Sequence, residues 1–422
     1  MHRFVFFSIF FGLIFLNCEK GHLLTIAVGG APNELDYWEK LIREFEERTG
    51  IKVKLIRQPT DTDQRRQSLI IPLKAKKPDP DVFLMDIAWL GGFAASGWLQ
   101  ALDDYVKRDT FDLTKFFKPV VTSVDIYEGA LVALPVYIDC GLLYYRKDLL
   151  EKYGCPVPRT WEELLQVATL IQKKERTRNP RFYGFVWQGA QYEGLVCNFL
   201  EFITSAGGGL FDSLGNINLC SKTNIHALTF MKDLIHKYKI SPPNTYTEMK
   251  EEEVRISFQN GDALFERNWP YAWKLHESND SPVKGKIGVT LLPAFKTGKT
   301  ASALGGWHIG ISAYSDNKEQ AWQLVKFILS YESQKRLAID LGWNPGREDV
   351  YEDPELKHNL PHINVLKESF NHAVARPNVP YYTRLSQILQ IYVNAAISGR
   401  IEPEEALKKA EEKMREIIHT YE

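Results

Sequence analysis

The chain has 422 residues, and the usual domain size of about 100 to 200 residues predicts two or three compact units. Hydrophobic residues make up 44% and charged residues 25%, which excludes wholesale disorder and a polytopic membrane protein. With 52 Lys and Arg against 53 Asp and Glu, the net charge of -1 gives no field that would gather nucleic acid. We therefore expect no nucleic-acid partner and a neutral ligand.

The N-terminal segment predicts export. Arg3 precedes an apolar run from Phe4 to Leu16, too short for a stable membrane anchor but suited to the hydrophobic region of a secretory signal. The run leads to Cys18 and resembles a bacterial lipoprotein signal, in which the Cys becomes the acylated first residue. Residues 1–17 are the predicted signal peptide and 18–22 a lipidated tether, with an ordinary signal peptide as the alternative. The expected location is periplasmic or at the cell surface, with a membrane contact through Cys18 only.

Beyond Cys18 the chain has four cysteines, Cys140, Cys155, Cys197 and Cys220. An even number permits three complete disulfide pairings in an oxidising compartment, and buried free thiols are the alternative. CxxC and HExxH patterns are absent from the sequence. We expect neither a metal site nor a cofactor.

The first elements alternate between strand and helix. Leu23 to Val28 predicts a strand, and Gly50 ends a helix whose apolar positions are Trp38, Leu41, Ile42 and Phe45. The alternating segment 51–55 and the apolar run from Asp81 to Met85 predict two further strands. This order indicates an α/β fold, in which Asp86 stands beyond the carboxyl end of a strand, where such sheets bind ligands.

A second α/β region begins near Tyr137. Thr160 and Glu163 form a capping box, followed by a helix whose predicted apolar stripe is Trp161, Leu164, Leu165, Ala168 and Ile171. Further helices are predicted over Ile225 to Tyr238, Lys318 to Ser330 and Pro403 to Thr420. With no long linker in the sequence, short or multiple crossings must join the two regions.

Aromatic residues stand beside polar ones in three segments that Gly or Pro marks: Pro135 to Asp139, Asn268 to Trp273 and Gly305 to His308. A sugar has apolar C–H faces and a rim of hydroxyls, so rings can cover a face while Asp, Glu and Arg bind the rim. Core packing is the alternative for each ring taken alone. The pattern favours a carbohydrate site.

The segments Leu134 to Leu149, Pro158 to Leu164, Lys286 to Pro293 and Val393 to Arg400 resemble the extracellular solute-binding proteins of ABC sugar importers. Tyr192 to Leu195 and Gly305 to His308 are most similar to the maltose/trehalose-binding branch of that family. The resemblance covers the mature chain in the right order. It implies a periplasmic-binding-protein-like clamshell of type II, with two discontinuous α/β lobes joined by three crossings.

The resemblance also implies lobe boundaries. The N-terminal lobe would comprise residues 23–137 and 291–331, and the C-terminal lobe residues 138–290 and 332–422. The crossings would lie near Tyr137 to Gly141, Val289 to Pro293 and Ser330 to Ser333.

The same family implies ten ligand-binding residues. Asp86 and Asp139 would accept sugar hydroxyls, Gly305 would offer its backbone, and Arg376 would donate from the second lobe. The rings are Tyr137, Trp269, Tyr271 and Trp307. Glu34 and Arg65 match less closely, and a solvated surface charge is the alternative for both.

The function implied is that of a monomeric, non-enzymatic receptor. It would capture a disaccharide or short oligosaccharide between closing lobes and deliver it to the permease subunits of an ABC transporter. A rival prediction is a secreted glycoside hydrolase that uses Asp86 and Asp139 as its two carboxylates. A third keeps the fold and replaces the sugar by a glycerol phosphate or an amino compound.

Overall fold

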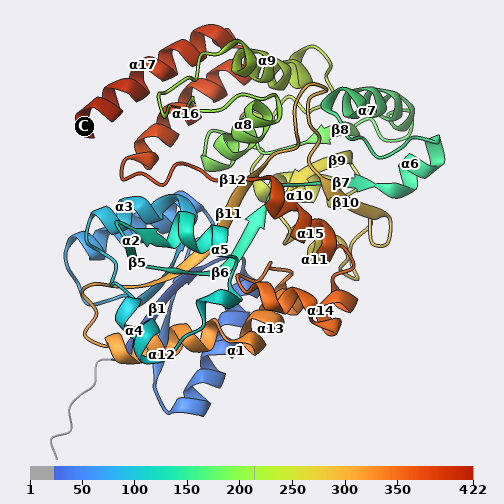
Figure 1. Cartoon of the computed structure of the whole chain (residues 1–422). Helices are drawn as coiled ribbons and strands as arrows, with labels where there is room; N and C mark the ends of the chain where they lie inside the picture. Colours follow the sequence, from blue (N-terminus) through green and yellow to red (C-terminus); the bar gives the residue numbers. More distant parts are fainter. Residues whose placement is uncertain (1–22, 213, 422) are drawn as a thin grey trace, which may run out of the picture.

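The computed structural model describes residues 23–212 and 214–421. The predicted signal peptide, Cys18 and the tether lie outside these residues. Two lobes, each with its own β-sheet and its own covering helices, lie one above the other in Figure 1. The predicted α/β class with two lobes is confirmed.

The sheet of the first lobe has the strand order β12-β11-β3-β1-β2, and β6 also pairs with β11. The first three strands are parallel, as an α/β alternation requires, while β11 runs antiparallel to β3 and β6. Its strands are β1 Leu24–Gly29, β2 Val53–Gln58, β3 Val82–Asp86, β6 Leu134–Cys140, β11 Ser302–Ile311 and β12 Ala373–Val374.

The second lobe holds a four-stranded sheet of order β10-β7-β9-β8. Its strands are β7 Leu142–Arg146, β8 Tyr183–Val186, β9 Ala263–Asn268 and β10 Ile287–Leu291. A separate hairpin pairs β4 Ile126–Tyr127 with β5 Ala130–Leu131.

Helices fill the intervals between strands and make up most of the C-terminal third (Figure 1). In chain order the α-helices are α1 Pro32–Thr49, α2 Thr62–Lys74, α3 Leu90–Ala95, α4 Asp103–Arg108, α5 Lys118–Val120, α6 Lys147–Tyr153, α7 Trp161–Glu175, α8 Glu193–Ser205, α9 Lys222–His236, α10 Glu251–Gln259, α11 Ala272–His276, α12 Lys318–Ile328, α13 Tyr331–Leu341, α14 Pro354–Asn359, α15 Ile363–Ser369, α16 Tyr382–Ile397 and α17 Pro403–Tyr421. The short 3-10 and π turns are η1 Ile87–Trp89, η2 Leu113–Lys115, η3 Val121–Asp125, η4 Glu348–Glu352 and η5 Phe370–His372.

Local sequence signals account for several helix ends. Gly50 adopts a left-handed φ of 74° and caps α1, as the sequence predicts. The Thr160 hydroxyl accepts a hydrogen bond from the Glu163 N–H at 3.2 Å, and the Glu163 carboxylate accepts one from the Thr160 N–H, so the predicted capping box starts α7. Of the predicted stripe on α7, Leu165 is only half-buried, and the other four residues are buried.

Two chain connections between strands join the lobes directly. β6 belongs to the first sheet and β7 to the second, with Gly141 alone between them. The chain returns from β10 of the second sheet to β11 of the first. After α12, the chain reaches α16 of the second lobe through α13, α14, α15 and β12.

Leu337 and Trp343 pack in the same apolar cluster as Trp38 of α1 and Trp322 of α12. First-lobe packing therefore continues past Ser330 to Ser333, where the third crossing is predicted. The lobe boundaries given above stay a prediction.

Candidate functional site

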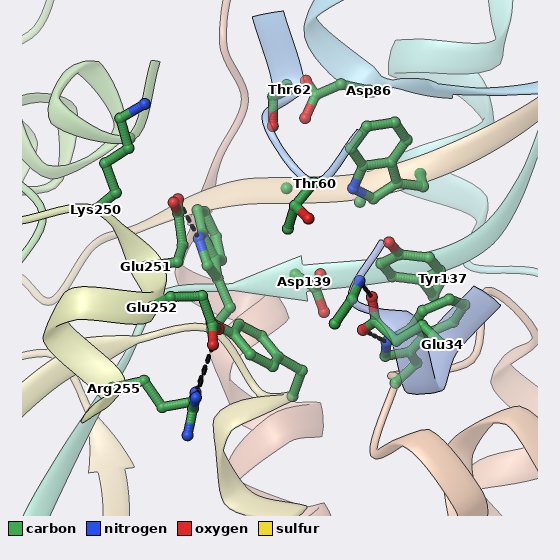
Figure 2. Close-up of a pocket in the computed structure, with 18 of the residues that line it drawn as sticks. Glu34, Thr60, Thr62, Asp86, Tyr137, Asp139, Lys250, Glu251, Glu252 and Arg255 are labelled. Atoms are coloured by element: carbon green, nitrogen blue, oxygen red, sulfur yellow. Dashed lines mark hydrogen bonds and ion pairs between the residues drawn. The ribbon is translucent and has the colours of Figure 1, made fainter. Parts of the chain in front are cut away.

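A cavity of about 560 Å³ lies between the lobes. Its wall includes all ten residues that the family resemblance implies: Glu34, Arg65, Asp86, Tyr137, Asp139, Trp269, Tyr271, Gly305, Trp307 and Arg376. These residues are spread between positions 34 and 376 of the chain, and the fold brings all ten to one place. Figure 2 shows Glu251, Glu252 and Arg255 of the second lobe on one side of the cavity, with Glu34 and Tyr137 on the other.

Glu34 lies in the first turn of α1, and two hydrogen bonds hold its carboxylate at the cavity wall. Its Oε2 accepts the Ala31 N–H at 2.8 Å and its Oε1 accepts the Trp343 indole N–H at 3.2 Å. A Cβ on Gly30, whose φ is +151°, would lie 2.3 Å from Oε2, so this position needs glycine. Burial raises the pKa of Glu34, which the Ala31 hydrogen bond partly offsets.

Arg65 lies on α2 and is only 5% exposed. Its Nε donates to the Pro59 carbonyl at 2.7 Å, and its guanidinium carbon lies 4.3 Å from the ring centre of Trp307. Burial lowers the pKa of Arg65. The alternative of a solvated surface charge is therefore wrong for this residue.

Two ring pairs hold Tyr137 and Trp307 in the cavity wall of the first lobe. Tyr137 stacks on Trp343 with ring centres 4.2 Å apart, and Trp307 meets Trp89 edge to face at 5.3 Å. Trp307 is half-buried, whereas Trp89 is buried. Tyr137 and Trp307 line the cavity, so each ring has a side that faces the cavity as well as a packed side.

The second lobe contributes two further rings, each hydrogen-bonded by the first turn of α10. The Trp269 indole N–H donates to Glu251 at 3.4 Å, and the Tyr271 hydroxyl donates to Glu252 at 2.7 Å. A Cβ on Gly305 would lie 3.1 Å from the Trp269 ring, so this glycine lets the ring approach β11. Burial raises the pKa of the Glu251 carboxyl group.

Arg376 joins carboxylates from the two lobes. Its Nη2 lies 3.0 Å from Asp86 Oδ1, at the end of β3, and its Nη1 lies 2.9 Å from Glu193 Oε1, at the start of α8. The side chain of Arg376 is 3% exposed and that of Asp86 12%. Burial alone would lower the pKa of Arg376, but the charges of Asp86 and Glu193 raise it well above its usual value.

Asp139 lies on β6, at the floor of the cavity and beside the crossing at Gly141. Burial, together with the negative charges of Glu34 and Asp86, raises its pKa to about 7. Asp86 has a raised pKa as well, for which burial is the main cause, opposed by Arg376. Burial therefore disfavours the ionised forms of Asp86 and Asp139, and a hydrogen bond from a hydroxyl donor would stabilise them.

Several cavity residues are absent from the sequence prediction, above all Asp61, Glu193, Lys250, Glu251, Glu252, Arg255 and Trp343. Trp343 follows Gly342 and precedes Asn344-Pro345, so it fits the same rule of a Gly- or Pro-marked aromatic segment that selected Trp307. The acidic run of Glu251 to Glu253 starts a helix and gives no separate signal, because acidic residues are common in a first helical turn.

The structure includes the four cysteines that follow Cys18. Cys140, Cys155, Cys197 and Cys220 are free thiols, so no disulfide joins them in this structure. Within residues 23–212 and 214–421, no group of three or more His, Cys, Asp or Glu could hold a metal ion. Over the same residues, each helix is too short or too polar to cross a bilayer.

Comparisons with known proteins agree with this architecture. Residues 31–335 match the family described as bacterial extracellular solute-binding protein. A probable ABC transporter-binding protein of Deinococcus radiodurans is 36% identical over 399 residues, covering 93% of each chain. A maltotriose-binding protein of Pyrococcus abyssi is 29% identical over 83% of this chain and 72% of its own.

Among solved structures, the maltose-bound MalE3 of T. maritima is 42% identical. It superposes with a TM-score of 0.88 over 93% of this chain and 99% of its own. The two-lobed periplasmic-binding-protein fold predicted from the sequence is thereby confirmed. On the family match, the Deinococcus relative and this superposition together, the chain belongs to the bacterial extracellular solute-binding protein family.

Proposed function

We propose that the protein is the sugar-binding receptor of an ABC importer, taking a disaccharide or short oligosaccharide of the maltose/trehalose type. The observation that carries the proposal is the interlobe cavity, in which flat rings and hydrogen-bonding carboxylates come from both lobes. A cavity of about 560 Å³ is within the usual size of small-molecule sites. The relatives named for maltose and maltotriose support the same ligand class.

The chemistry of the wall suits a polyhydroxylated ligand. Tyr137, Trp269 and Trp307 can cover apolar sugar faces, while Asp139 and Asp86 accept hydroxyl hydrogens. Oδ1 of Asp86 already accepts the Ala88 N–H and pairs with Arg376, so its second oxygen is the one left for a ligand. A micromolar ligand needs about 8 kcal/mol of binding free energy, which a few such contacts in a desolvated cavity can supply.

The charges of the wall favour a neutral ligand over a glycerol phosphate. The cavity has more acidic than basic residues, and Lys250, Arg255 and Arg376 are each already paired with a carboxylate. Two further basic residues of the wall, Arg65 and Lys274, are not in such a pair within the described part of the chain, so the preference for a neutral ligand rests on the excess of acidic over basic residues around the cavity.

A hydrolase is the second candidate, and the raised pKa of Asp139 is the observation that favours it. A carboxyl group that titrates near pH 7 can act as a general acid, with Asp86 as the second carboxylate. We propose a receptor without catalysis because Asp86 is held by Arg376 in a bridge between lobes.

Membership of an extracellular family implies an exported protein. We further propose that the mature protein is a monomer, that Cys18 anchors it to the membrane through lipid, and that closure over the sugar presents it to the permease. Closure follows if the ligand binds both lobes, because only a difference in affinity between open and closed states can shift their populations.

The test is a thermal-shift screen of the mature protein over a carbohydrate library that includes maltose, trehalose, maltotriose, a glycerol phosphate and an amino sugar. A ligand at 100 times its Kd should stabilise the folded state by about 2.7 kcal/mol. Each stabilising sugar is then recovered after incubation and examined for cleavage. Stabilisation by sugars without turnover is expected; turnover would establish the hydrolase, and a response to the phosphate alone would refute the sugar receptor.

A further inference from the structure

Trp269 presents only one face to the cavity, because a cation covers the other. The guanidinium carbon of Arg267 lies 4.0 Å from the ring centre of Trp269. Arg267 itself is 1% exposed and does not line the cavity. At this distance the cation is attracted to the indole ring and fixes its plane.

Arg267 is held in turn by Glu201 of α8, which is 2% exposed. The contact is bidentate: Arg267 Nε donates to Glu201 Oε2 at 2.9 Å, and Nη2 donates to Oε1. Gln188 contacts the same residue twice: its Nε2 donates to the Arg267 carbonyl at 3.1 Å, and its Oε1 accepts from Arg267 Nη1 at 3.5 Å. The planar guanidinium is thereby fixed in one orientation.

Glu201 also contacts the backbone at both connections between the lobes. Its Oε1 accepts the Ala303 N–H of β11 at 3.0 Å. A Cβ on Gly141, the single residue between β6 and β7, would lie 2.1 Å from that oxygen and 2.5 Å from Arg267 Nη2. The ion pair therefore packs directly on the backbone of the two interlobe connections.

We propose that Arg267 and Glu201 are positioning residues, which hold the Trp269 ring in place for sugar stacking and tie that place to the interlobe strands. The inference rests on the proposed sugar function but concerns residues that do not contact the ligand. It explains why a complete ion pair is buried where an apolar pair would fill the same space at no desolvation cost.

Arg267→Lys tests the proposal, because lysine keeps the charge but cannot make the bidentate contact and stack at once. With maltose as the probe, isothermal titration below the unfolding temperature of each variant should show a Kd at least five-fold weaker. Arg146→Lys is the matched control: Arg146, on β7 of the same sheet, makes a bidentate pair with Asp148 of α6 outside the cavity, and this variant should bind maltose as the wild type does.

The distinguishing experiment is a double-mutant cycle with Trp269→Ala. If Arg267 acts through the ring, Arg267→Lys should change the Kd less than two-fold once the ring is gone. An equal loss with and without Trp269, or wild-type affinity in Arg267→Lys, would overturn the proposal. Glu201→Gln serves as the second variant if Arg267→Lys does not fold, with the same expected loss of affinity and the same dependence on Trp269.

A ligand-free measurement separates this inference from the proposed function. In protein labelled with fluorotryptophan, the ¹⁹F resonance of Trp269, identified by its absence in Trp269→Phe, should shift in Arg267→Lys and not in Arg146→Lys. An unchanged resonance refutes the positioning role even if sugars bind. A shifted resonance in a wild-type protein that binds none of the library sugars would support the positioning role while the proposed function fails.

Discussion

Asp61 and Lys250 form an ion pair between the two lobes, with Lys250 Nζ 2.9 Å from Asp61 Oδ2. Asp61 caps α2 in the first lobe, where its Oδ1 accepts the Gln64 N–H at 3.0 Å, and Lys250 precedes α10 in the second. Both line the cavity, and their side chains are 29% and 43% exposed, which puts the pair at its rim. Separation of the lobes must break this contact.

We expect this ion pair to favour the closed state by a modest amount. Lys250→Met should weaken sugar binding about 1.4- to five-fold, since partly exposed pairs contribute about 0.2 to 1 kcal/mol. Asp61→Asn, which can still cap the helix, should have the same effect, and the double variant should lose no more than either single one.

Two measurements check this expectation. The difference between wild type and Lys250→Met should shrink when the salt concentration is raised to 0.5 M, because salt screens exposed charges. Lys232→Met, which removes an exposed pair with Glu402 within the second lobe, is the control and should bind sugar normally. Additive losses in the Asp61 and Lys250 variants would show that the residues do not act as a pair.

Trp307 is expected to matter more for binding than for stability. The ring is half-buried between Arg65 and Trp89 and faces the cavity, so Trp307→Ala should weaken sugar binding at least ten-fold, about 1.4 kcal/mol. A fully buried Trp would instead contribute about 3 to 5 kcal/mol to stability. Titration calorimetry and thermal unfolding of the ligand-free protein separate the two; a large loss of stability with normal affinity would mark Trp307 as a packing residue.

Local pattern was enough to predict the elements that begin the chain. β1, α1 and β3 follow from apolar periodicity and from Gly50, because short-range sterics and burial on one face decide those segments. The ten cavity residues came instead from the order of family-like segments. Periodicity alone could not predict that Glu34 and Arg376 line the same cavity.

The residues that the sequence did not predict depend on contacts between distant segments. The indole of Trp343 reaches Glu34 across 309 positions, and Lys250 reaches Asp61 across 189. In the sequence, Lys250 stands at the start of a helix that opens with charged residues, which is a common pattern. Only the approach of the two lobes gives it a partner, and this approach has no local signature.

Asp139 should make the stability of the ligand-free protein depend on pH. Burial raises its pKa to about 7, whereas an Asp in an unfolded chain titrates near 3.9. Between these values the folded state binds more protons, so the stability this group contributes is complete below about pH 4 and is lost as the pH rises to about 7. Relative to Asp139→Asn, the wild type should lose at most about 1.4 kcal/mol per pH unit over that range.

Denaturant unfolding of both proteins between pH 4.5 and 8 measures this difference. Glu34 and Asp86 also have raised pKa values and are present in both proteins, so the difference between the two curves reports on Asp139 together with its electrostatic coupling to these two groups. A constant difference over the whole range would show that Asp139 is ionised throughout.

Cys18 is expected to carry lipid. When the full precursor is expressed in a bacterial host with labelled palmitate, the label should enter the wild type and be absent from Cys18→Ala. Equal labelling of the two would rule out acylation at this position and leave an exported protein without a lipid anchor.

Arg376 should decide how completely the sugar-bound protein closes. Its guanidinium lies between Asp86 of the first lobe and Glu193 of the second, and Glu193 also accepts the Tyr382 hydroxyl at 2.6 Å. Arg376→Met would leave the buried Asp86 and the partly buried Glu193 without their shared cation, and losing one partner of a buried pair costs up to about 3 to 5 kcal/mol. Under the proposed mechanism, closure brings the two carboxylates together, so the cost falls on the closed state. In small-angle scattering the sugar-saturated wild type should have a smaller radius of gyration than the ligand-free protein, and Arg376→Met should contract only in part. Arg255→Met, which breaks a pair with Glu252 inside one lobe, should contract fully when saturated. If the wild type does not contract at verified saturation, closure is not the mechanism even where sugar binding is established.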